Sequence, residues 1–213
     1  MDACCESKAD DLAALRGRQA RVLRIVLAVN AVMFFVEFGA GWIAGSTALM
    51  GDSLDMLGDA LVYGFSLYVV AKTDVWRARA AQLKGVLMLA FGVGVLLKAG
   101  TTLTSGVVPA ASTMAAIGLL AFAANAFCFA LLSRHRSDDL NLRSTWLCSR
   151  NDLVANASVL VAAFLVARLG SFWPDVLVGG GIAVLFLRTA WVVLRESSTE
   201  LSRLRSASAF DPT

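Results

Sequence analysis

The stretch Asp52-Ser-Leu-Asp55-Met-Leu-Gly-Asp59 places three carboxylates inside an otherwise apolar run from Gly45 to Ala71. In a helix, positions i, i+3 and i+7 fall on one face, so the three acids form a single stripe. A charged side chain at the centre of a membrane helix costs about 2.5–3.5 kcal/mol on the insertion scale. A chain that keeps three of them is therefore expected to use them. The alternative is a water-exposed amphipathic helix, but the opposite face offers no polar stripe.

The composition around this stretch is typical of a membrane protein. The chain has 213 residues, of which 58% are hydrophobic, and this is too apolar for an ordinary soluble domain. At about 20 residues per spanning helix, the length accommodates six helices with short loops. We predict an all-α membrane protein whose six transmembrane helices lie at about 22–43, 47–71, 83–103, 112–132, 145–166 and 175–194.

The distribution of basic residues predicts the orientation of these helices. Lys and Arg gather in the N-terminal head, in the second and fourth links and in the tail, whereas the first and third links contain neither. The positive-inside rule then places both termini in the cytoplasm. We expect a cytoplasmic N-terminal segment at 1–21, a six-helix transport domain at 22–195 and a short cytoplasmic tail at 196–213. A multi-pass protein of the inner (cytoplasmic) membrane is the predicted location.

Soft metal ligands occur outside the predicted spans as well. The four cysteines do not form a disulfide framework, so we interpret the thiols as reduced. Cys4 and Cys5 are candidate accessory ligands for a thiophilic metal, although two adjacent cysteines alone do not complete a tetrahedral site. A disordered terminus is the alternative. His135, the only histidine, is a candidate surface ligand in a polar loop, and a merely solvated loop is the other interpretation.

Further polar residues lie within the predicted spans. Asn30 and Glu37 are seven residues apart and share one face of the first helix. A carboxylate at this position faces the bundle rather than lipid, so Glu37 is a candidate for proton handling or for a structural hydrogen bond. Asp52 and Asn151 are candidates for the ion pathway or for proton handling.

The second and fifth predicted helices run in opposite directions and bring acids to overlapping depths. A rise of 1.5 Å per residue places Asp55 and Asp59 about 13–20 Å below one surface and Asp152 roughly 10–13 Å below the other. Cys148 lies one turn before Asp152. Three neighbouring carboxylates repel one another unless a divalent cation or protons compensate them. Such a site predicts an exchange of one divalent cation for two protons.

The same residues carry a resemblance to a known family. The segment from Asn30 to Ala60 resembles the first two helices of the cation diffusion facilitators, whose second helix carries a [His/Asp]-x-x-x-Asp pair. Asp55 and Asp59 match that pair, and Cys148 and Asp152 fall on a second such pair in the fifth helix. Residues 138–144 resemble the link into the fifth helix, and residues 173–175 resemble the start of the sixth. The resemblance covers about residues 25–195.

This resemblance implies a secondary transporter that exports a divalent metal in exchange for protons. Asp55, Asp59, Cys148 and Asp152 would form a tetrahedral site. Cysteine replaces the usual His or Asp, and a thiolate favours Zn²⁺ or Cd²⁺ over Mn²⁺ or Mg²⁺. If Cys148 is a spectator, Asp52 or Asn151 supplies the fourth contact. The resemblance also implies a homodimer, although the cytoplasmic domain that usually follows the sixth helix is not matched in the short tail.

Two alternative functions stay open. The same fold would also suit Fe²⁺, Co²⁺, Ni²⁺ or Mn²⁺, and a membrane metal-binding or sensor protein would bind metal without transporting it. No nucleophile–base pair, nucleotide-binding loop or intramembrane protease motif is visible, so an enzyme is not expected. We expect the metal to be the transported substrate and no cofactor, with protons and the lipid bilayer as partners and no nucleic acid.

Overall fold

Six α-helices make up the part of the chain that the computed structural model describes, which comprises residues 3–69, 74–133 and 140–210. Within these ranges, side chains are described from Arg21 onward, except at 62, 65–69, 74, 77, 140–151, 205 and 207–210. No strand occurs in the described ranges, which confirms the predicted all-α class. The helices are α1 (Ala3–Ala44), α2 (Thr47–Val69), α3 (Asp74–Ser105), α4 (Ala111–Ser133), α5 (Leu140–Leu169) and α6 (Trp173–Phe210).

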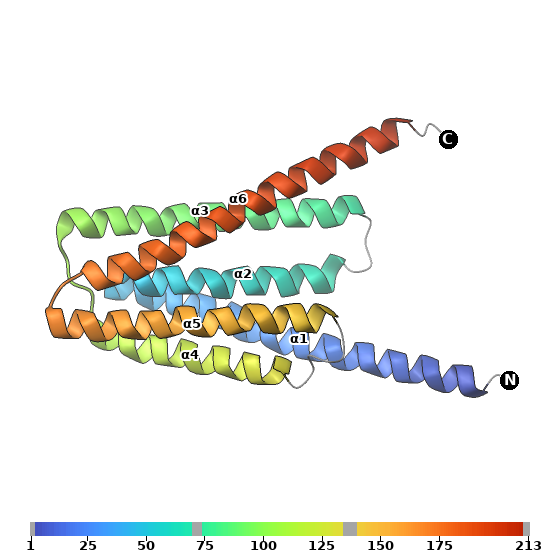
Figure 1. The fold of residues 1–213 in the computed structure, drawn as a ribbon, viewed down its shortest axis with the longest axis horizontal. Helices are drawn as coiled ribbons and strands as arrows, with labels where there is room; N and C mark the ends of the chain where they lie inside the picture. The colour runs from blue at the N-terminus through green and yellow to red at the C-terminus, as the bar shows by residue number, and fades with distance from the viewer. Residues whose placement is uncertain (1–2, 70–73, 134–139, 211–213) are drawn as a thin grey trace.

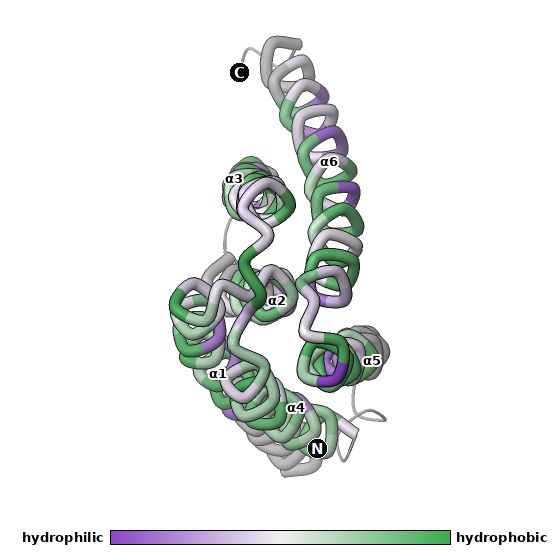
Figure 2. Tube along the Cα trace, turned by 90° about the vertical axis from the view of Figure 1, so that its left-hand side faces the viewer, coloured by the Kyte–Doolittle hydropathy of each residue, from purple (hydrophilic) through white to green (hydrophobic). Residues whose placement is uncertain are grey.

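The acid-bearing helix α2 lies at the centre of the bundle. It contacts each of the other five helices, and Figure 2 shows it between α1, α3, α6 and α5 when the bundle is viewed end-on. The two chain ends lie at the same end of the bundle, where α1 and α6 project outward (Figure 1). The helix with the most intramembrane charge is therefore the helix that the others shield most completely.

The turn between α1 and α2 is too short to allow any arrangement except an antiparallel hairpin. Gly45 adopts φ +70°, a left-handed conformation that glycine reaches without the steric penalty of a Cβ. The amide of Gly45 donates to the carbonyl of Trp42, and the amide of Ser46 donates to the carbonyl of Gly41 at 2.8 Å. This is the Schellman pattern that terminates a helix. It fixes the angle at which α2 enters the bundle.

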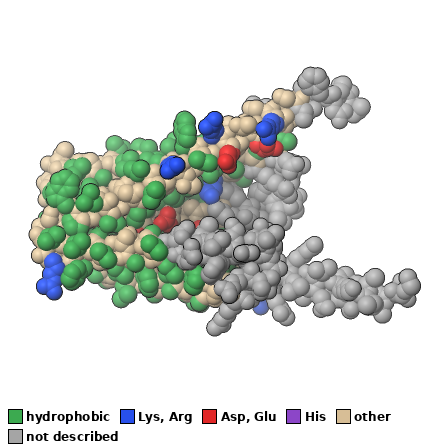
Figure 3. Space-filling view, in the orientation of Figure 1, with side chains coloured by type: hydrophobic (Ala, Val, Ile, Leu, Met, Phe, Trp, Pro, Cys, Tyr) green, Lys and Arg blue, Asp and Glu red, His purple; other side chains and the backbone are tan. Residues whose placement is uncertain are grey.

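The outer surface of the bundle is suited to lipid. Helices α1, α3, α4, α5 and α6 each contain a segment long and apolar enough to cross a membrane. In α2, every 18-residue window contains Asp52, Asp55 and Asp59, so this helix does not qualify by composition. Phe35 remains 73% exposed and Ile43 86% exposed, and Figure 3 shows apolar side chains across the face of the bundle. This confirms a multi-pass membrane protein with α2 as its buried helix.

Two helices are much longer than the predicted membrane spans. α1 begins at Ala3 instead of Val22, and α6 continues to Phe210 instead of ending near Leu194. At 1.5 Å per residue, helices of 42 and 38 residues reach about 63 and 57 Å, roughly twice the hydrocarbon thickness. Hydropathy predicts the segment of a helix that lies in lipid. The helix itself continues until a helix-breaking residue such as proline or glycine ends it. Pro109 lies in the link between α3 and α4, and Pro174 lies in the first turn of α6, so neither interrupts the interior of a described helix.

A buried carboxylate ties the start of α6 to the start of α2. Asp175 accepts hydrogen bonds from the hydroxyl of Ser46 at 2.6 Å, from the amide of Thr47 at 2.7 Å and from the amide of Ala48 at 3.0 Å. Ser46 also caps α2, because its Oγ accepts from the amide of Leu49 at 3.1 Å. An anion at a helix N-terminus is stabilised by these free amides and by the helix dipole. Asp175 is fully buried, and its charge is well compensated.

One turn further along α6, the backbones of α2 and α6 touch directly. A Cβ at Gly179 would overlap the carbonyl of Thr47, and a Cβ at Gly51 would lie 3.0 Å from the carbonyl oxygen of Gly179. Neither position accepts even a methyl group unless the helices separate. The Asp175 contact and this glycine contact together fix the position of α2.

Gly179→Ala is expected to lower the apparent melting temperature in detergent, because overpacking a tight contact costs about 1–3 kcal/mol. Gly181→Ala is the matched control, since a Cβ there meets nothing within 4 Å. That control should be neutral or should gain up to about 1 kcal/mol from helix propensity. Thermal unfolding followed by circular dichroism checks both variants, and equal melting temperatures would contradict the close contact.

Candidate metal centre

The three acids of α2 differ in their surroundings although they share one helix. Asp52 is fully buried, whereas Asp55 and Asp59 are half-buried. Asp55 interacts electrostatically with both of the others. In Figure 3, acidic side chains are visible in a hollow between apolar surfaces, near the middle of the bundle. The stripe therefore faces the interior, as its spacing predicts.

A fourth acid approaches this stripe from α5. Asp152 is half-buried and interacts electrostatically with Asp59 first, and then with Asp55 and Asp52. The predicted meeting of the second and fifth helices is therefore present, because α2 and α5 are in direct contact. Among the side chains that the structure describes, no three metal-ligating groups gather closely enough to hold an ion. The four-ligand site remains a prediction.

The other predicted ligands fall outside the described side chains. Cys148 lies on the helix α5 one turn before Asp152, but its side chain is not among those described, and the same holds for Asn151. Cys4 and Cys5 lie in the first turns of α1, also without described side chains. His135 lies in the link 134–139, outside the described residues.

Two residues near Asp59 were not anticipated from the sequence. The hydroxyl of Tyr63 donates to Asp59 Oδ2 at 2.8 Å, and Tyr63 is only 2% exposed. Lys84 of α3 interacts electrostatically with the same carboxylate. The spacing of Asp59 and Tyr63, i and i+4, was the available signal for the first contact. Lys84 stands 25 residues away in the chain, so only the packing of α3 against α2 reveals the second.

A second group of polar side chains lies next to the acid stripe. Asn156 of α5 donates from Nδ2 to Asp52 Oδ1 at 2.9 Å, and Glu37 of α1 faces Asp52. Glu37 and Asn156 are fully buried. Asn30 shares α1 with Glu37, but its amide donates to the carbonyl of Val26 at 2.9 Å, within its own helix. The predicted shared face of the first helix thus brings Glu37 to the stripe, whereas the described hydrogen bond of Asn30 stays within α1.

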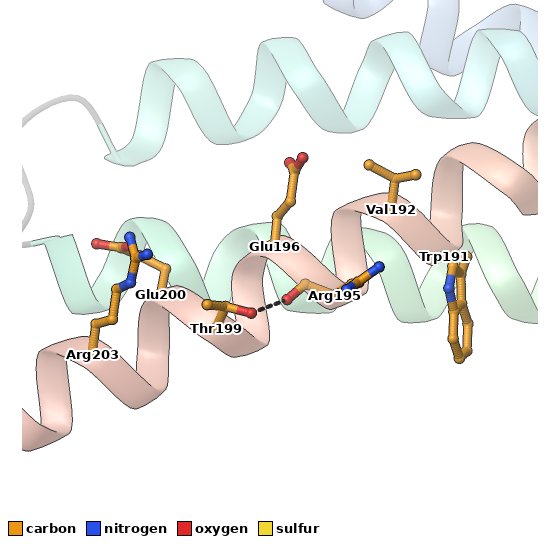
Figure 4. Close-up of a pocket in the computed structure, with 7 residues that line it drawn as sticks. All are labelled: Trp191, Val192, Arg195, Glu196, Thr199, Glu200 and Arg203. Atoms are coloured by element: carbon orange, nitrogen blue, oxygen red, sulfur yellow. Dashed lines mark hydrogen bonds and ion pairs between the residues drawn. The ribbon is translucent and has the colours of Figure 1, made fainter.

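A groove in the structure is lined by none of these acids. It has a volume of about 450 Å³ and follows the projecting part of α6. Figure 4 shows that its lining residues all come from this helix, with Glu196, Glu200 and Arg203 among them. Because the groove belongs to one exposed helix, it is not the place where the predicted ligands meet.

Comparisons with known proteins relate this chain to transporters of metal cations. Residues 23–202 match the family model described as the cation efflux transmembrane domain. The chain is similar to the zinc transporter ZitB of Yersinia pestis, with 27% identity over 192 residues, 84% of this chain and 62% of that protein. It is similar to the metal cation efflux system protein CzcD of Cupriavidus metallidurans, with 25% identity over 193 residues, 85% of this chain and 61% of that protein.

A third relative is the cadmium, cobalt and zinc/H(+)-K(+) antiporter of Bacillus velezensis. It is 22% identical over 195 residues, which cover 85% of this chain and 62% of that protein. The chain therefore spans about 62% of the length of the curated relatives that it matches.

Tyr63→Phe is expected to weaken Zn²⁺ binding roughly tenfold, since a hydrogen bond to a charged group contributes about 1.5–3 kcal/mol. The lost hydroxyl leaves Asp59 less stabilised as an anion. Isothermal titration calorimetry on the purified protein measures the change. In an Asp59→Asn background the same substitution should have no further effect, which makes a double-mutant cycle the control. Equal affinity of Tyr63→Phe and the parent would contradict a role for this contact.

Proposed function

The chain belongs to the cation efflux family, and on this premise we propose that it exports a divalent transition-metal cation from the cytoplasm in exchange for protons. Membership of the family confirms the resemblance that the motifs predicted. The relatives carry the names of zinc, cadmium and cobalt transporters, and they are not named as enzymes. We take the metal to be the transported substrate, with no resident cofactor.

The observation that supports this proposal most directly is the approach of Asp152 on α5 to Asp55 and Asp59 on α2. These acids lie in a bundle whose outer surface is apolar, where uncompensated charge is costly. One divalent cation compensates two carboxylates, and two protons do the same. A site that must be filled by one or the other is suited to exchanging them.

The direct contact of α2 with α5 also supports a mechanism for this exchange. If the two helices separate toward the cytoplasm, metal reaches the acids, and if they separate toward the other side, metal leaves and protons take its place. Alternating access of this kind needs only rocking of helices about a fixed site near the middle of the membrane. α2 is clamped to α6 at one end through Asp175, so we propose that α2 and α6 move together.

Zinc or cadmium is the proposed substrate because Cys148 would add a soft ligand to three carboxylates. Manganese and magnesium prefer oxygen donors alone. Iron, cobalt and nickel stay as alternatives for the same fold. Cys4, Cys5 and His135 are proposed as accessory ligands only, since they lie outside the predicted membrane spans.

Both termini lie at one end of the bundle, and we propose that this end is cytoplasmic. The basic residues concentrate at this end, with Arg21, Arg24, Arg79, Arg195 and Arg203 exposed there. The positive-inside rule then sets the orientation in the inner membrane. A homodimer is the proposed assembly.

Asp59→Ala and Asp152→Ala are each expected to abolish zinc-dependent proton flux in proteoliposomes, because each removes one carboxylate from the exchange site. The flux is measured with a pH-sensitive dye inside the vesicles. Glu200→Gln is the control, since this acid lies on the exposed part of α6 and should leave the flux unchanged. Undiminished flux in both Ala variants would refute the assignment, and zinc binding without flux in the parent would favour a membrane sensor.

Cys148→Asp is expected to shift the preference from cadmium and zinc toward manganese, because it replaces a soft thiolate with a hard carboxylate. Competition calorimetry with the three metals on parent and variant measures the shift. We expect the ratio of cadmium to manganese affinity to fall by at least about tenfold, or about 1.4 kcal/mol. An unchanged ratio would mean that Cys148 is not a ligand.

A further inference from the structure

Three fully buried polar side chains from three helices meet beside the candidate metal centre. They are Glu37 of α1, Asp52 of α2 and Asn156 of α5. Asn156 Nδ2 donates to Asp52 Oδ1 at 2.9 Å, and the carboxyl groups of Glu37 and Asp52 lie within hydrogen-bonding reach of each other. Because these residues come from α1, α2 and α5, the cluster joins elements that are far apart in the sequence.

The cluster has many acceptors and too few donors. Both carboxyl oxygens of Glu37, Oδ2 of Asp52 and Oδ1 of Asn156 receive no hydrogen bond from any N–H or O–H group that the structure describes. The amide of Asn156 already donates to the other oxygen of Asp52. Two ionised carboxylates cannot bond to each other, and burying both without compensation costs several kcal/mol per charge. One added proton turns their contact into a short, charge-assisted O–H···O⁻ hydrogen bond.

We propose that Glu37 and Asp52 form a proton-binding site, separate from the metal ligands, in which the two carboxyl groups share one proton. Two carboxylates held this close cannot both ionise, as in acid dyads elsewhere. The inference rests on the proposed exchange of metal for protons. It adds the location of one proton that the ligands themselves do not carry.

A proton suits this cluster better than a metal cation. In this cluster, four side-chain oxygens receive no hydrogen bond from a described group, whereas Ca²⁺ takes 6–8 oxygen ligands and Mg²⁺ requires six in octahedral geometry. The three residues are two acids and an amide, so the cluster offers zinc neither the sulfur nor the imidazole ligands that it prefers. All three side chains are fully buried, and a proton needs no additional space.

The position of this site links it to the candidate metal centre. Asp52 lies three residues before Asp55 on α2, and Asn156 lies four residues after Asp152 on α5. Because the two helices run in opposite directions, both place the proton-binding residue on the same side of the metal-site acid. The charged groups that face Glu37 and Asp52 are Asp55 and Asp152. A divalent cation bound between those acids would replace their negative charge with positive charge. Metal binding therefore favours loss of the shared proton, and by linkage the proton weakens metal binding.

Burial also determines when the proton can leave. In the conformation described, neither Glu37 nor Asp52 has exposed surface, so the proton has no direct contact with water. The cluster lies between α1, α2 and α5, and its exposure requires these helices to move apart. Release of the proton is thereby tied to the same rearrangement that opens the metal centre.

Infrared difference spectroscopy on the purified full chain at neutral pH tests the proposal without any transport. The parent is expected to show the C=O stretch of a protonated carboxylic acid that disappears when Zn²⁺ is added. Glu37→Gln keeps the shape and can donate its amide to Asp52, but it has no acid proton, so the part of the band that the Glu37–Asp52 pair contributes should be absent. Asp52→Asn is the second variant, in case the first does not fold. Glu196→Gln, on the exposed part of α6, is the control and should retain the band.

The number of protons released per zinc ion gives an independent readout, measured by calorimetry in buffers of different ionisation enthalpy. It should fall by about one in Glu37→Gln, because one shared proton is removed. Absence of the band in the parent, or the same proton release in parent and variant, would overturn the proposal. A band that responds to Na⁺ or K⁺ instead of Zn²⁺ would also overturn it, in favour of a cation site. If the predicted band and proton release occur but flux is absent, the transport proposal fails and the proton site stands.

Discussion

The absence of water inside an apolar helix bundle is the constraint on which this structure depends. A carboxylate there must be compensated by hydrogen-bond donors, a cation or a proton. This requirement explains why the helix that carries Asp52, Asp55 and Asp59 lies at the centre while five apolar helices surround it. It also explains why the polar residues of α1 and α5 point toward that helix. The other helices therefore surround α2 and keep its three acids out of contact with lipid.

Two buried acids show opposite ways of meeting this constraint. Asp175 accepts three hydrogen bonds at the start of α2, where free amides and the helix dipole favour an anion. Its compensation is complete and permanent, as suits a structural contact. Glu37 is equally buried but receives no hydrogen bond from any group that the structure describes. Where the protein supplies no donor for a buried carboxylate, a mobile species such as a proton must compensate its charge. Burial alone does not separate structural acids from functional ones, whereas a count of donors does.

The class of fold and the inward face of the acid stripe could be predicted from the sequence, because hydropathy and helical spacing are local properties. The meeting of Asp152 with Asp55 and Asp59 followed from counting residues along two antiparallel helices. The contacts of Tyr63, Lys84 and Asn156 could not be predicted in the same way, because helix rotation and tilt decide which side chain faces which neighbour. The extensions of α1 and α6 beyond the predicted membrane spans could not be inferred either, because hydropathy detects lipid rather than helix breakers.

The partners of α2 lie far downstream in the chain, and this has a consequence for biosynthesis. Asn156 is 104 residues after Asp52, and Asp175 is 129 residues after Ser46. At 5–20 residues per second, the ribosome needs about 6–26 s to make the second interval. During that time the three acids of α2 lack their final neighbours. The hairpin of α1 and α2 must therefore stay inside or beside the insertion machinery until α5 and α6 have been synthesised and can pack against α2.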